Sequence, residues 1–84
     1  MEVNIVNTKI YIDMNVTFEK NGSMLLISFK WPDGTIFHID KVLNKQFWYT
    51  SSKGSSVYRY TCLIKGKKRY IFCDNNKWYM ELHK

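Results

Sequence analysis

The stretch from Ile10 to Phe18, IYIDMNVTF, decides the fold class, because every second residue from Ile10 onwards is a large apolar one. A period of two indicates a β-strand with one buried face. Asn21-Gly22 follows, and this pair is a strong hairpin signal because a two-residue type I′ turn needs positive φ at both positions. The sequence therefore predicts that Met24–Trp31 returns antiparallel to Ile10–Phe18.

The register of this hairpin can be tested against the side-chain pattern. A two-residue turn collects apolar residues on one face, with Phe18 opposite Leu25, Val16 opposite Ile27, Met14 opposite Phe29 and Ile12 opposite Trp31. The other face pairs Asp13 with Lys30 and Asn15 with Ser28. A slip by one residue would spoil both faces, so the pattern favours this register.

Trp31-Pro32-Asp33-Gly34-Thr35 predicts the next turn, a three-residue loop in which glycine takes the left-handed position. Thr35 should then lie opposite Trp31, Phe37 opposite Phe29, and Ile39 opposite Ile27. These residues predict a first three-stranded meander that ends near residue 43.

A second meander is predicted from strands at 57–64, 69–74 and 77–82, with turns at Gly66-Lys67 and Asn75-Asn76. Two-residue turns would place Cys62 opposite Ile71, Tyr60 opposite Cys73 and Cys73 opposite Trp78. One face is apolar and should form a wall of the core: Tyr58, Tyr60, Cys62, Ile64, Ile71, Cys73, Trp78, Met80 and Leu82. The other face carries Arg59, Thr61, Leu63, Tyr70, Phe72, Asp74, Lys77, Tyr79 and Glu81, with Arg59 expected opposite Asp74 and Phe72 opposite Tyr79.

Residues 44–56 connect the two meanders and are expected to form a loop that contains the aromatic cluster Phe47-Trp48-Tyr49. Val3–Val6 could add an edge strand. We expect residues 1–84 to form one all-β domain, a small antiparallel barrel or roll of SH3-like or OB-like size built from two three-stranded meanders.

The composition agrees with a folded β domain. The 84 residues are 45% hydrophobic and 17% aromatic and include no alanine, which disfavours both disorder and helix. No apolar run approaches the roughly 20 residues that span a bilayer, and the first residues lack a basic region followed by an apolar run, so we expect no signal peptide. We therefore expect a cytoplasmic protein with no membrane partner and with reduced cysteines at Cys62 and Cys73.

The charge is unevenly distributed. The chain carries +6, but residues 1–40 sum to −2 and residues 41–84 sum to +8. A basic half suggests an anionic partner. The alternative is ordinary solubility charge, because most of these lysines fall in predicted turns.

The run Phe29–Leu43, with its Trp31-Pro32-Asp33-Gly34 turn and its Ile39-Asp40-Lys41-Val42-Leu43 end, resembles a pattern found in small uncharacterised bacterial proteins. Tyr58–Gly66, Tyr70-Ile71-Phe72 and Trp78-Tyr79 are similar to the rest of that pattern, so the resemblance covers roughly residues 24–82. It implies a small standalone bacterial domain with no established activity. The Phe47-Trp48-Tyr49 cluster has no counterpart in the pattern.

The sequence offers little for catalysis. His38 and Asp40 share one strand face, and Ser28 lies opposite His38, but an open sheet face supplies no oxyanion donors. Cys62 and Cys73 lack a CxxC spacing, and the two histidines complete no zinc set. We expect no enzyme activity, no cofactor and no metal.

The outer face of the second meander is the best candidate for binding, because aromatic rings there lie between cationic side chains. The candidate residues are Arg59, Tyr70, Phe72, Tyr79, Lys77, Lys67, Lys68, Arg69 and Trp48. Three interpretations stay open: the aromatic cluster at 47–49 covers this face, another protein or a second copy binds it, or single-stranded nucleic acid stacks on it. The sequence favours a non-catalytic protein-binding or self-associating module, with nucleic-acid binding as the alternative.

Overall fold

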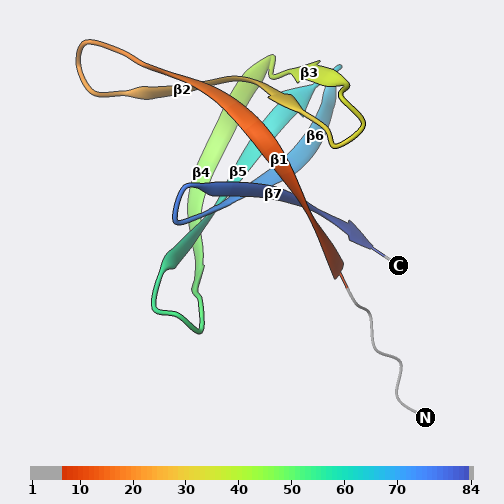
Figure 1. Ribbon diagram of the computed structural model, residues 1–84. Helices are drawn as coiled ribbons and strands as arrows, with labels where there is room; N and C mark the ends of the chain where they lie inside the picture. The colour runs from red at the N-terminus through yellow and green to blue at the C-terminus, as the bar shows by residue number, and fades with distance from the viewer. Residues whose placement is uncertain (1–6, 84) are drawn as a thin grey trace.

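The computed structural model describes residues 7–83, and these form one antiparallel sheet of seven strands (Figure 1). The strands are β1 (Asn7–Phe18), β2 (Met24–Lys30), β3 (Ile36–His38), β4 (Lys41–Thr50), β5 (Ser56–Ile64), β6 (Lys67–Asp74) and β7 (Lys77–His83). Their order across the sheet is β3-β2-β1-β7-β6-β5-β4. The prediction of an all-β, barrel-like antiparallel fold is confirmed, whereas the strand suggested at Val3–Val6 lies outside the described residues.

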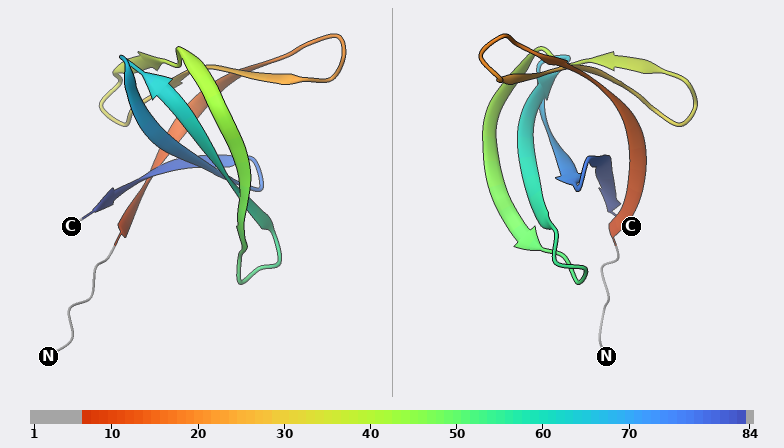
Figure 2. Two further views of the ribbon diagram at one scale, coloured as in Figure 1. Left: turned by 180° about the vertical axis from the view of Figure 1, so that it is seen from behind. Right: turned by 60° about the vertical axis from the view of Figure 1, so that its left-hand side comes forward.

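The sheet curls into a half-barrel because β3 and β4 are its two edges but follow each other in the chain. At their junction the Ile39 N–H donates to the Ile27 carbonyl of β2, while the Asp40 N–H donates to the Leu63 carbonyl of β5. The two edges of the sheet therefore meet at residues 39–40. Away from this point they diverge, which leaves the half-barrel open along β4 (Figure 2).

The register of the first hairpin differs from the predicted one. Glu19 and Ser23 close a three-residue loop in which Gly22 has φ +89°, so Phe18 lies opposite Met24 and Val16 opposite Leu26. A β-bulge after Asn15 absorbs the difference, and Asp13 and Asn15 keep their predicted partners Lys30 and Ser28. Consequently Leu26 is buried, whereas Leu25 and Ile27, expected inside, are 45% and 37% exposed.

The second turn of the first meander is as predicted. Gly34 has φ +93°, and the Trp31 N–H donates to the Thr35 carbonyl across the three-residue loop. Phe29 lies opposite Phe37, and their rings stack at 5.4 Å.

The β5–β6 hairpin differs from the prediction by two residues. Its turn is Lys65-Gly66 rather than Gly66-Lys67, with φ +52° and +76°, so Cys62 lies opposite Arg69 and Tyr60 opposite Ile71. Arg59 consequently faces Phe72 and not Asp74. A shift of two keeps every side chain on its predicted face. The Asn75-Asn76 turn and the pairs Cys73–Trp78 and Phe72–Tyr79 are confirmed.

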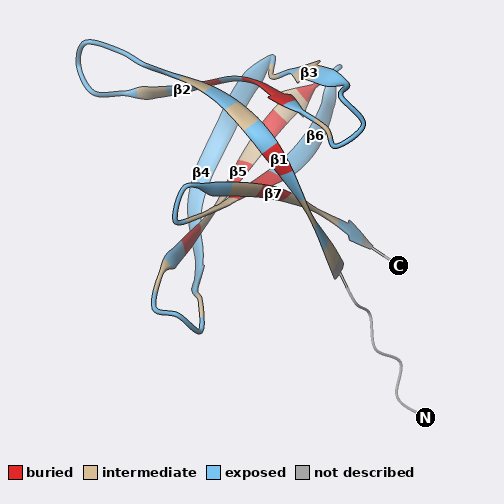
Figure 3. Ribbon diagram, in the orientation of Figure 1, coloured by how far each residue is buried: buried red, intermediate tan, exposed pale blue. Residues whose placement is uncertain are grey.

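The main core fills the concave side of the half-barrel, and its buried members come from both meanders: Ile12, Leu26, Phe29, Tyr60, Cys62, Ile64 and Ile71 (Figure 3). Tyr58, Cys73, Trp78 and Met80 pack against it, as predicted. Leu82 was expected on this wall but is 47% exposed. A second, smaller core of Val57, Phe72 and Tyr79 lies on the other face of the sheet.

Residues 44–50, expected to lie in a loop, instead continue β4, and only residues 51–55 form the connecting turn. The Ser51 N–H donates to the Ser55 carbonyl to close it. All ten residues of β4 are exposed. An edge strand with both faces exposed carries no alternation of buried and exposed positions, which explains why periodicity could not identify it.

Candidate functional site: an aromatic face beside an exposed edge strand

The outer face centres on Arg59, whose guanidinium lies between two aromatic rings. Its Cζ is 4.1 Å from the centre of the Trp48 ring and 4.2 Å from that of Tyr70. One terminal nitrogen donates to Gln46 Oε1 at 3.1 Å, whereas the buried Nε has no partner among residues 7–83. Two cation–π contacts therefore hold the charged group in place on the sheet.

A β-bulge in β4 builds this arrangement. The register shifts between Phe47 and Tyr49, so that Phe47 lies opposite Tyr58 and Tyr49 opposite Val57. Trp48 is the extra residue, and its ring lies 6.4 Å from that of Phe72. Tyr49 lies close enough to Tyr79 to contribute to the raised pKa of the Tyr79 hydroxyl. The bulge thus brings both Trp48 and Tyr49 over the outer face.

Trp48 and Tyr49 therefore cover the centre of the outer face, which the sequence predicts as a binding surface. Phe72 and Tyr79 stack at 5.1 Å and are only 5% and 1% exposed, so neither ring can take a base or a partner side chain. Burial is the main cause that raises the pKa of Tyr79, with the neighbouring Tyr49 adding to the effect. Tyr70 and Trp48 remain 47% and 43% exposed, each with Arg59 against one face.

The four predicted basic residues of the β6 and β7 region are all exposed but do not form one cluster. Lys68 lies opposite Leu63 and shares the outer face with Arg59. Lys67 and Arg69 lie opposite the core residues Ile64 and Cys62, so they belong to the inner side. Lys77 begins β7 beside the Asn75-Asn76 turn. The basic residues at the start of β6 are therefore divided between the two faces of the sheet.

The edge strand β4 is the part of the surface that sequence patterns missed. Its apolar side chains are more than one third exposed: Val42, Leu43, Phe47, Trp48 and Tyr49. In Figure 3, β4 is pale along its whole length beside the partly buried β5. Lys45 turns to the concave side, where its Nζ lies 4.7 Å from the centre of the Tyr58 ring. The edge therefore combines apolar side chains, cations and main-chain groups that pair on one side only.

The residues considered for chemistry are spread over both meanders. Ser28 lies opposite His38, as predicted, but its Oγ bonds to Asn15 Nδ2 at 3.4 Å. Within the described part of the chain, no three His, Cys, Asp or Glu side chains are grouped to hold a metal. Cys62 and Cys73 are not joined, and burial raises the pKa of the Cys62 thiol to about 11. That pKa keeps the thiol protonated and unreactive near neutral pH.

Comparison of the chain with protein-family models, with curated proteins and with solved structures finds no match. The resemblance of residues 24–82 to small bacterial proteins therefore stays an expectation. No helix among residues 7–83 has the length and apolar character needed to cross a membrane.

Proposed function

We propose that this protein is a non-catalytic binding module that takes an extended, acidic segment of another protein along the edge of β4. The observation that carries the proposal is a ten-residue edge strand with every residue exposed and with Phe47, Trp48 and Tyr49 in its second half. An added strand gains main-chain hydrogen bonds from such an edge, and exposed side chains on alternate sides provide selectivity.

The charge of the surface favours an acidic partner over a second copy. Lys41 and Lys45 lie on β4 itself, and Lys53 lies in the turn that follows it. The whole chain carries +6, so two copies repel each other, whereas an acidic segment is attracted. The two bulges in β4 leave a regular central stretch, Asn44–Phe47, on which a strand can align.

Single-stranded nucleic acid is a second candidate, and the Trp48–Arg59–Tyr70 stack supports it. Both rings are exposed and Lys68 lies on the same face, which is the combination that backbone-tracking, base-stacking surfaces use. Burial of Phe72 and Tyr79 leaves fewer rings for stacking, so this candidate ranks second.

The test is a fluorescence-anisotropy titration with a labelled decapeptide that alternates glutamate and valine, beside a lysine–valine decapeptide and oligothymidylate. We expect saturable binding of the acidic peptide alone. Phe47→Ser should weaken it by about tenfold or more, since a central apolar anchor is lost. Phe18→Ser is the matched control, because Phe18 is 69% exposed on the other hairpin and should leave binding unchanged.

Three results would overturn the proposal. The first is failure of the acidic peptide to bind, and the second is equal weakening by Phe47→Ser and Phe18→Ser. The third is preferred binding of oligothymidylate with an affinity that falls steeply with salt, which would transfer the assignment to nucleic acid. Sedimentation of the protein alone at rising concentration reports whether a second copy occupies the edge instead.

A further inference from the structure

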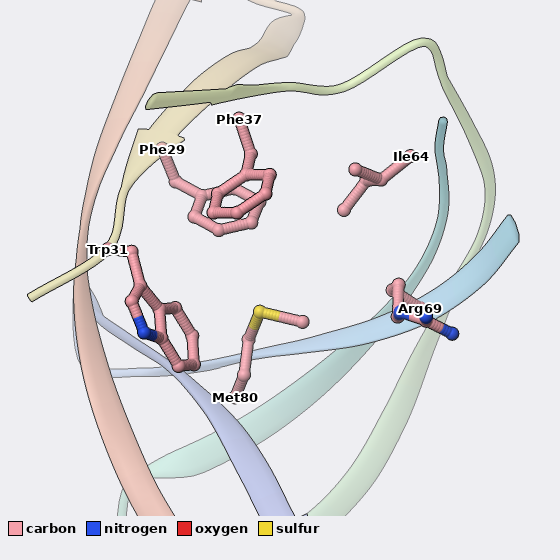
Figure 4. A pocket seen from close by; sticks show the side chains of 6 residues that line it. All are labelled: Phe29, Trp31, Phe37, Ile64, Arg69 and Met80. Atoms are coloured by element: carbon pink, nitrogen blue, oxygen red, sulfur yellow. The ribbon is translucent and has the colours of Figure 1, made fainter. Parts of the chain in front are cut away.

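We infer that the concave side of the half-barrel holds a second, independent site, a cavity that binds a small aromatic carboxylate. The cavity has a volume of about 160 Å³ and is lined by Phe29, Trp31, Phe37, Ile64, Arg69 and Met80 (Figure 4). It lies inside the sheet, away from the Trp48–Arg59–Tyr70 stack on the outer face.

The size and lining select the apolar part of the ligand. Apolar cavities of about 150 Å³ in proteins hold a single benzene ring, so a volume of about 160 Å³ has room for one ring. Phe29 and Phe37 stack on each other at 5.4 Å along one side, and Trp31 and Met80 lie across from them. Aromatic rings and a thioether favour contact with an aromatic ring over a flexible alkyl chain.

The rim selects the charge of the ligand. Arg69 is the one charged residue among the described residues that line the cavity. In Figure 4 its guanidinium lies at the outer margin, on the side away from Trp31, and one nitrogen donates to the Lys68 carbonyl at 3.1 Å. Lys65 brings a second cation, with its Nζ 5.3 Å from the centre of the Phe37 ring. Two exposed cations beside an apolar cavity match a carboxylate on a ring, and Arg pairs with carboxylate in a bidentate geometry.

The cavity borders the part of the sheet where β6 and β7 separate. These strands pair only from Phe72–Tyr79 to the turn, although β6 begins at Lys67 and β7 ends at His83. Arg69 and Met80 line the cavity on the concave side and also a hollow that includes Tyr70 and Glu81. The cavity and this hollow therefore adjoin at Arg69 and Met80, where the two strands separate.

The experiment is an NMR titration of the full chain with 3-phenylpropionate, beside its neutral counterpart 3-phenylpropan-1-ol. We expect saturable shifts of the Met80 methyl and the Trp31 indole N–H with the acid, and binding of the alcohol that is weaker by about tenfold. Arg69→Gln should weaken the acid by a similar factor and leave the alcohol unchanged. Lys68→Gln, the adjacent cation on the outer face, should leave both unchanged.

The inference is wrong if the acid shifts neither reporter, if acid and alcohol bind equally, or if Lys68→Gln weakens the acid as much as Arg69→Gln. The comparison of acid with alcohol uses the unaltered protein, so it decides the question even if Arg69→Gln does not fold. The cavity and the edge of β4 are tested with different probes, and either can fail without the other.

Discussion

Arg59, on β5, connects side chains of the two neighbouring strands on the outer face of the sheet. Its guanidinium contacts Trp48 on β4 and Tyr70 on β6, and it donates to Gln46. The same contacts cover one face of each ring. The sequence identified Arg59, Tyr70 and Trp48 as binding candidates, but no pattern could show that they bind each other, because that contact depends on the bulge in β4.

Arg59→Met should lower the free energy of unfolding by about 1–2 kcal/mol, since two cation–π contacts and one hydrogen bond are lost while the alkyl stem is kept. Urea unfolding followed by tryptophan fluorescence measures the change. Arg69→Met is the control, because Arg69 is exposed and bonds only to a neighbouring carbonyl among the described contacts, so its effect should stay within about 0.5 kcal/mol. Equal effects of the two substitutions would show that the stack contributes nothing.

Cys62 predicts a pH dependence of stability. Burial raises its pKa from 9.0 to about 11, so the unfolded chain releases this proton at lower pH than the folded one. The stabilisation is complete below pH 9 and is lost as the pH rises towards 11. Compared with Cys62→Val, the wild type should lose roughly 1 kcal/mol more between neutral pH and about pH 10. Parallel pH profiles of unfolding free energy for the two proteins would refute this assignment.

At the scale of elements, sequence patterns located strands better than they located turns. Alternation identified the inner residues of β1 and β5–β7, and side-chain faces survived the two-residue shift at Lys65-Gly66 because strand periodicity is two. At Asn21-Gly22 the register differs from the predicted one by one residue, so the predicted faces of Leu25 and Ile27 are wrong. The bulge after Asn15 restores the predicted pairs beyond it. Turn length depends on one backbone conformation, which composition does not determine.

The alternation of apolar and polar residues does not predict the edge strand β4. Its ten residues are exposed on both sides, so no buried face imposes a period on them. Phe47-Trp48-Tyr49 is an apolar cluster in the sequence, but only pairing with β5 divides it, with Trp48 and Tyr49 on the outer face and Phe47 opposite Tyr58 on the concave face. Sequence patterns also miss the cavity, because its six lining residues come from separate strands and turns of both meanders.

At the scale of the whole molecule, the sheet is curled but not closed. Its edges meet only at residues 39–40, and β4 pairs with β5 on one side alone, which leaves a cationic edge with exposed aromatic residues on a chain of charge +6. In the right-hand view of Figure 2, β4 is the outermost strand on its side of the half-barrel, with β5 next to it. This edge is where we propose that a strand from an acidic partner binds.

The most direct test is amide hydrogen exchange, read residue by residue by NMR, with and without a saturating glutamate–valine decapeptide. We predict that the solvent-facing amides of β4 gain protection on binding, since they acquire main-chain partners, while amides of β2 and β7 keep their rates. Bound peptide with unchanged exchange along β4, or with protection gained only elsewhere on the sheet, would contradict the claim.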